Sequence, residues 1–203
     1  MTNLLVVQAH PLSAEKSRSV ATQEAFIASY KKNNPTDTVT VLDIYKEDVP
    51  EIDAHLFETW ATAAGQNKLS AEQLATLTRF NELTEQFLAH DKIVVTNPLW
   101  NLNIPSRLKS WIDTIVVKGK TFTYTETGPL GLVPEKKLLH IQSNGGSFSG
   151  NEPGSQYLET IFNFMGVTDI EHIFIEGVDH YPEKAEEIIA EAHKKAEHLA
   201  ETF

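Results

Sequence analysis

Short apolar runs rich in β-branched residues alternate with longer amphipathic stretches along this chain, and that alternation restricts the possible folds more than any other feature. It is typical of a parallel sheet with helices on both faces. The runs expected to form strands lie at residues 4–7, 38–43, 92–96, 137–142 and 170–175. The first run is apolar without interruption, as in a strand buried on both faces. We therefore predict an α/β protein with five parallel strands.

Helices are expected between these strands, each marked by apolar residues at helical spacing or by a capping signal. They are predicted at residues 19–32, 55–63, 70–90, 106–117 and 157–165, and from 182 nearly to 203, with a small hairpin within 121–131. Ser70 and Gln73 form a capping-box pattern, and Gly166 suits the position just past a helix end. Right-handed crossovers then favour a flavodoxin-like three-layer sandwich with strand order 2-1-3-4-5. No linker or repeat divides residues 1–203, so one domain is predicted.

Composition excludes several classes of function. Seventeen basic and 28 acidic residues give a net charge of −11, which disfavours a nucleic-acid partner. The absence of cysteine excludes disulfides, thiolate metal sites and a cysteine nucleophile. The chain contains no apolar run approaching the ~20 residues needed to span a bilayer and no signal-peptide pattern, so we expect a cytoplasmic protein with no membrane partner.

In an open parallel sheet the ligand crevice lies beyond the carboxyl ends of the strands, so the segments that follow strands one, three and four are the candidate site. After strand one, the hydroxyls of Ser17 and Ser19 and the guanidinium of Arg18 coincide with a predicted helix N-terminus. Together with the helix amides they could hold a phosphate. The alternative is an ordinary serine N-cap with solvated neighbours.

After strand three, residues 97–105 combine two prolines, Trp100 and several carboxamides. Such a loop suits a flat aromatic ligand, which would stack on apolar side chains while backbone amides meet its polar edge. Alternatively, Trp100 packs into the core.

After strand four, Gly145 and Gly146 could adopt φ values closed to other residues and let backbone amides approach a ligand, or the segment could be a flexible loop. A nucleophile elbow is excluded because Phe148 stands where serine is required. No dinucleotide-binding Gly-x-Gly-x-x-Gly or Walker A motif is present.

These segments, taken together and in order, resemble a known family. The matching features are Ala-His-Pro at 9–11 followed by Ser-Arg-Ser at 17–19, Asn-Pro-Leu-Trp-Asn-Leu-Asn-Ile-Pro at 97–105, Leu-Lys-Ser-Trp-Ile-Asp at 108–113, Thr-Phe-Thr-Tyr-Thr-Glu-Thr-Gly-Pro at 121–129, and Ser-Asn-Gly-Gly at 143–146. The chain resembles the FMN-dependent NADH azoreductases, also described as FMN-dependent NADH:quinone oxidoreductases, of the flavodoxin-like superfamily.

The resemblance implies a bound FMN, one per subunit, with NADH as co-substrate and quinones or azo compounds as acceptors. The FMN phosphate would lie on Ser17, Arg18 and Ser19, with His10 close by. The flavin ring would contact Leu99, Trp100, Asn101 and Leu102, and its far edge would meet Ser143, Asn144, Gly145 and Gly146. NADH would deliver hydride to flavin N5 and leave before the acceptor reacts, so no catalytic side chain and no metal is expected.

The family's homodimer supplies part of each pocket from the other subunit, which makes a homodimer the expected assembly. Phe122, Tyr124 and either Phe162 or Phe164 are candidate walls of that pocket, or ordinary core aromatics. Two alternatives remain: an FAD-dependent quinone reductase of the related branch, and a flavodoxin-type electron carrier that passes electrons to a protein partner. His193 and His198 on the last helix are interpreted as part of a solvated face, and His140 as a core residue.

Overall fold

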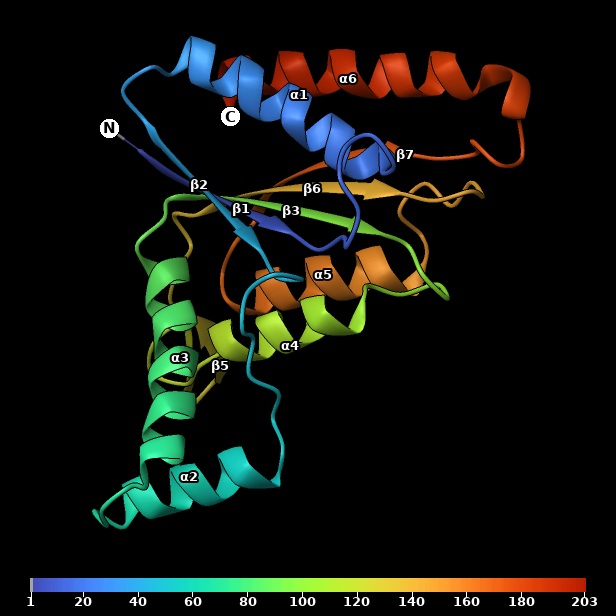
Figure 1. Cartoon of the computed structure of the whole chain (residues 1–203). Helices are drawn as coiled ribbons and strands as arrows, with labels where there is room; N and C mark the ends of the chain where they lie inside the picture. Colours follow the sequence, from blue (N-terminus) through green and yellow to red (C-terminus); the bar gives the residue numbers. More distant parts are fainter. Residues whose placement is uncertain (1) are drawn as a thin grey trace.

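The computed structural model describes residues 2–203 and contains a five-stranded parallel sheet between two layers of helices (Figure 1). The sheet order is β2-β1-β3-β6-β7, which is the predicted 2-1-3-4-5 order counted over the strands of the main sheet. Its strands are β1 (Asn3–Gln8), β2 (Thr38–Asp43), β3 (Lys92–Pro98), β6 (Lys137–Ser143) and β7 (Asp169–Ile175). The predicted hairpin is also present, as the antiparallel pair β4 (Phe122–Thr125) and β5 (Gly128–Gly131).

The register of the strands brings the candidate segments to one edge of the sheet. Gln8 of β1 pairs with Thr96 of β3, and Thr96 pairs with Ile141 of β6. Strands β3 and β6 continue together as far as the Pro98–Ser143 pair. Because all these strands are parallel, the loops that follow β1, β3 and β6 leave the sheet at the same edge.

Helices cover both faces of the sheet, with α1 and α6 on one side and α3, α4 and α5 on the other (Figure 1). Their bounds are α1 (Arg18–Asn33), α2 (Ala54–Ala64), α3 (Ala71–Leu88), α4 (Ser106–Ile115), α5 (Pro153–Phe164) and α6 (Ala185–Thr202). The capping box of Ser70 and Gln73 is present at the start of α3, as predicted. Helix α2 and the adjoining end of α3 extend away from the sheet.

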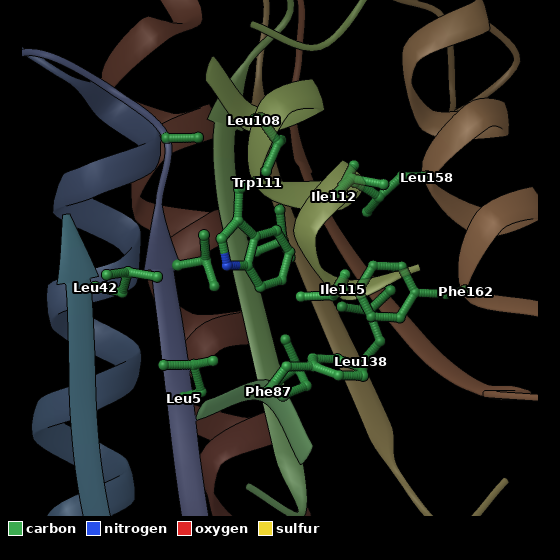
Figure 2. Close-up of a cluster of buried hydrophobic side chains, with 14 of the residues drawn as sticks. Leu5, Leu42, Phe87, Leu108, Trp111, Ile112, Ile115, Leu138, Leu158 and Phe162 are labelled. Carbon is green, nitrogen blue, oxygen red and sulfur yellow. The ribbon is translucent and has the colours of Figure 1, made fainter. Parts of the chain in front are cut away.

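Two hydrophobic clusters join these layers, one on each face of the sheet. Trp111 of α4 is the largest fully buried side chain, and it lies in a cluster that includes Leu5, Phe87 and Phe162 (Figure 2). On the other face, Phe26 packs with Phe203 at a ring-centroid distance of 5.7 Å. Burial of these aromatic groups contributes much of the favourable free energy that fixes α1, α4 and α6 on the sheet.

Two helix starts differ from the prediction. Helix α5 begins at Pro153 rather than at residue 157, because the Glu152 side chain caps it by accepting from the N–H of Ser155. Pro182 opens a short 3-10 turn (Pro182–Lys184), and α6 follows at Ala185. Among residues 2–203, no helix combines the length and the apolar character that a bilayer crossing requires.

Candidate functional site

A cleft of about 630 Å³ opens at the carboxyl edge of the sheet, within the range common for small-molecule sites. Its walls come from the loops after β1, β3 and β6, together with the loop between β7 and α6. The predicted site residues that line it are His10, Ser17, Arg18, Leu99, Trp100, Ser143, Asn144 and Gly145. Four others, Ser19, Asn101, Leu102 and Gly146, do not line it.

One end of the cleft is built to attract an anion. Ser17 is the N-cap of the 16-residue helix α1, and its hydroxyl accepts from the N–H of Val20 at 3.3 Å. The positive end of the helix dipole and N–H groups that lack helical acceptors point toward this end. Lys16 and Arg18 line it together with Glu15 and Asp179, so the attraction for an anion comes from the helix end and not from an excess of cations. Ser19 is fully buried behind Ser17, with 3.2 Å between their hydroxyl oxygens. It therefore holds the Ser17 hydroxyl in place at this end of the cleft and does not itself face the cleft.

His10 presents a neutral donor on the same wall. Its Nδ1 accepts the backbone N–H of Leu12 at 3.0 Å, so the proton of the neutral ring resides on Nε2. Burial lowers the pKa of His10 below its usual value, which favours this neutral form. The His10 ring lies 5.8 Å from the Trp100 ring, centroid to centroid, and the two together line the cleft.

The loop after β3 folds into a tight two-residue turn. Trp100 and Asn103 exchange two backbone hydrogen bonds of 3.0 Å, and Asn101 and Leu102 between them have φ values of 52° and 61°. Positive φ at both central positions defines a type I′ turn, which is strained for leucine. The N–H of Gly154 on α5 donates to the Leu102 carbonyl at 3.1 Å and holds this turn in place.

This turn explains why Asn101 and Leu102 lie outside the main cleft. They occupy its apex, and Leu102 is 50% exposed. Trp100 is 43% exposed, so the alternative in which it packs into the core is wrong. A second cleft of about 370 Å³ on another side of Trp100 is lined by Asn101 and Tyr157 among others.

The loop after β6 lines the cleft, but its glycines do not have the backbone conformation that was predicted for them. Gly145 and Gly146 do not have positive φ, so the prediction of special φ values is wrong. Gly145 lies against Asp179 instead, and a Cβ there would displace the Asp179 carboxylate from its present position. The Asn144 amide donates to the Gly146 carbonyl at 2.7 Å, whereas Asn144 Oδ1 is buried without a partner among the described residues.

A buried polar network under the site was not found from the sequence. His140 Nε2 lies 2.9 Å from Asn97 Oδ1, and Asn97 Nδ2 donates to Gln142 Oε1 at 3.0 Å. Gln142 Nε2 in turn donates to Glu152 Oε1 at 2.6 Å and to Ser155 Oγ at 3.1 Å. The network ties the ends of β3 and β6 to the start of α5, the helix that holds the tight turn. The only signal in the sequence was polar residues at the ends of apolar strands.

The aromatic residues considered as pocket walls separate into two groups. Phe162 is fully buried in the core beside Phe87, at a centroid distance of 6.2 Å, so it is not a wall residue. Phe122 packs on Phe164 at 4.7 Å at the base of the β4–β5 hairpin, whereas Tyr124 is 61% exposed.

His140 is fully buried, as expected of a core residue, although its Nδ1 lacks a partner in the described part of the chain.

Comparison with known proteins agrees with this geometry. A family model described as flavodoxin-like fold matches residues 2–200. The chain is 47% identical over 203 residues to an FMN-dependent NADH:quinone oxidoreductase of Streptococcus suis, and 46% identical to one of Bacillus pumilus, with full coverage of both proteins in each case.

Solved structures give the same result. A crystal structure of an azoreductase from Bacillus anthracis str. Sterne is 38% identical with a TM-score of 0.92, and all of both chains is covered. An FMN-dependent NADH-azoreductase from Bacillus anthracis str. Ames Ancestor, in complex with FMN, is 30% identical with a TM-score of 0.90, covering 98% of this chain and all of that one. The class is thus that of the flavodoxin-like fold. Within it, the chain belongs to the family of FMN-dependent NADH:quinone oxidoreductases and azoreductases, as its motifs indicated.

Proposed function

We propose that this protein is an FMN-dependent oxidoreductase that transfers a hydride from NADH to quinones and azo compounds. The observation that carries the proposal is one cleft with an anion-attracting corner at Ser17 and Arg18 and an aromatic wall at Trp100. A phosphate joined to a flat ring matches both ends at once. Because NADH is a cytoplasmic reductant, a cytoplasmic location is part of the proposal.

The polar loop after β6 supports the fit of a flavin. Ser143, Asn144 and Gly145 line the cleft opposite the start of α1, so polar groups lie where the polar edge of a flat ring would need them. Ser17 and Arg18, with Lys16 beside them, would hold the phosphate, and the Trp100 side chain would pack against the ring.

The chain's own residues would position the bound ligand and shield it from water, and they would not exchange protons with it. Flavin N5 supplies the hydride chemistry when the cofactor is bound, so no side chain is assigned as a catalytic acid or base. His10 lines the cleft with its Nε2 protonated, so its ring would offer a neutral donor to a ligand, and the tight turn at Asn101 and Leu102 would keep Trp100 in place against the ring. NADH and the acceptor are proposed to react in turn.

The test is an absorbance spectrum of the purified full-length protein loaded with FMN, followed by anaerobic addition of NADH. We expect the flavin absorbance to bleach with NADH alone and to return when a quinone is added. Protein that binds no FMN contradicts the proposal, and mass spectrometry that finds FAD favours the related quinone-reductase branch. A flavin that NADH cannot bleach favours an electron carrier. Stopped-flow data that require both substrates to be bound together would refute the sequential order.

We also infer that the protein is a homodimer. The tight turn and the β4–β5 hairpin expose large apolar side chains, including Leu102, Tyr124 and Leu130, which is 51% exposed. Leu102 is next to the cleft, whereas the hairpin lies at the other end of α4 (Figure 1). Exposed large apolar groups of this kind are typical of a surface that a partner covers. Sedimentation velocity of the full chain is expected to give the mass of two chains, about twice 22.7 kDa. A monomer at the concentrations used for activity assays would contradict this inference.

A further inference from the structure

An ion pair closes one side of the cleft at its anion-attracting corner. Arg18, at the start of α1, donates from its Nη2 to Oδ1 of Asp179 at 3.3 Å. Asp179 belongs to the loop between β7 and α6, and both residues line the cleft. Arg18 is predicted from the sequence to contact a phosphate, but its guanidinium is paired with a carboxylate in this structure.

Contacts between two loops place Asp179 at the cleft. The N–H of Gly177 donates to the Gly146 carbonyl at 2.7 Å and fixes the start of the Asp179 loop against the loop after β6. The Asp179 carboxylate lies against Gly145, where a Cβ would come within 2.3 Å of Oδ2 in the position that the side chain occupies here. The side chain reaches the cleft with no Cβ in its way.

The charges around this corner balance. Lys16 and Arg18 contribute two positive charges, and Glu15 and Asp179 contribute two negative charges. A phosphate monoester carries nearly two negative charges at neutral pH. It would meet Asp179 as a like charge, and it would compete with Asp179 for the Nη2 donor and the positive charge of Arg18.

We propose that Asp179 competes with the phosphate of FMN for Arg18 and so limits the preference of this site for FMN over riboflavin. The inference rests on the proposed flavin site. Binding of the phosphate would withdraw Arg18 from Asp179 and release the β7–α6 loop from α1. Asp179 is thus a specificity-determining residue that acts against the phosphorylated ligand.

The experiment measures flavin binding, not turnover. FMN and riboflavin are titrated by fluorescence quenching into the flavin-free full chain at low ionic strength, where surface charges are weakly screened. The proteins are wild type, Asp179→Asn, Arg18→Gln and the double variant. Glu58→Gln is the control, because it removes an equal charge from an exposed position on α2, an element that extends away from the sheet.

Asp179→Asn is expected to bind FMN about three- to fivefold more tightly, as the loss of a competing surface ion pair implies, with riboflavin unchanged. In the Arg18→Gln background the same change should give a smaller gain, and Glu58→Gln should give none. Weaker FMN binding by Asp179→Asn would overturn the proposal, because it would mean that Asp179 orients Arg18 for the phosphate. Unchanged FMN binding, or an equal gain for riboflavin, would overturn it too. Wild-type protein that binds neither flavin would refute the proposed function itself, a result distinct from any of these.

Discussion

Lowering the pH from 7 to 5 is expected to reduce the free energy of unfolding by about 2 kcal/mol through His140 alone. This histidine lies within β6 and is fully buried. Burial, and secondarily the nearby His172, lowers the pKa of His140 to about 3. The cause is physical: a protonated ring would have to exist without water and next to a second imidazole.

The sign follows from proton binding in the two states. In the unfolded chain His140 regains the ordinary histidine pKa of about 6.5 and takes up a proton below that pH. In the folded chain it stays neutral until about pH 3. The unfolded state therefore binds more protons between these values, so the stability that is present above pH 6.5 falls steadily toward pH 3. Burial also lowers the pKa values of His10 and His172, which add to the same trend.

Urea unfolding at pH 7 and pH 5 measures this effect. His140→Gln keeps an N–H donor for Asn97 but removes the titrating ring, so the difference between the two pH values should shrink by about 2 kcal/mol relative to wild type. His198→Gln replaces an exposed histidine on α6 and serves as the matched control. An unchanged pH difference in His140→Gln would show that this ring is not the source of the acid sensitivity.

The strand order and the edge that carries the site could be predicted from the sequence because both follow from short-range signals. Uninterrupted apolar runs identify buried parallel strands, and right-handed crossovers limit their order. The segment around Ser17 was predictable for the same reason, since a serine before an amphipathic stretch is a local capping signal.

Three features of the site that could not be predicted depend on contacts between residues far apart in the sequence. Gly145 lies against Asp179, and the turn at Leu102 accepts a hydrogen bond from Gly154. The start of α5 depends on Glu152, whose buried carboxylate also accepts from Gln142. No periodicity in the sequence reports such pairs, because each residue acts only where the fold places its partner. The loops of the site and most of the residues that line the cleft could therefore be predicted from the sequence, but not the contacts that hold those residues in place.

Gly131 illustrates the same dependence at the β4–β5 hairpin, the element proposed to lie in the subunit interface. It ends β5 against the last turn of α5, and a Cβ there would come closer than 3.0 Å to the backbone of Met165 and Gly166. Next to it, the N–H of Val133 donates to the Met165 carbonyl at 3.1 Å. The obstacle is therefore backbone that a hydrogen bond holds in place, not a side chain that could rotate away.

Gly131→Ala is accordingly expected to lower the free energy of unfolding by about 3 kcal/mol or more, because the hairpin or the end of α5 must shift to admit one methyl group. Gly119→Ala is the matched control. Gly119 has φ +83° but open space around the position of a Cβ, so only backbone strain of about 1 kcal/mol is expected there. Urea unfolding of both variants compares the two losses of stability, one caused by contact of the new methyl group with backbone and the other by the positive φ alone. Equal losses would mean that the contact at Gly131 relaxes freely. A much larger loss for Gly131→Ala would show that the backbone at Met165 and Gly166 does not yield to the added methyl group.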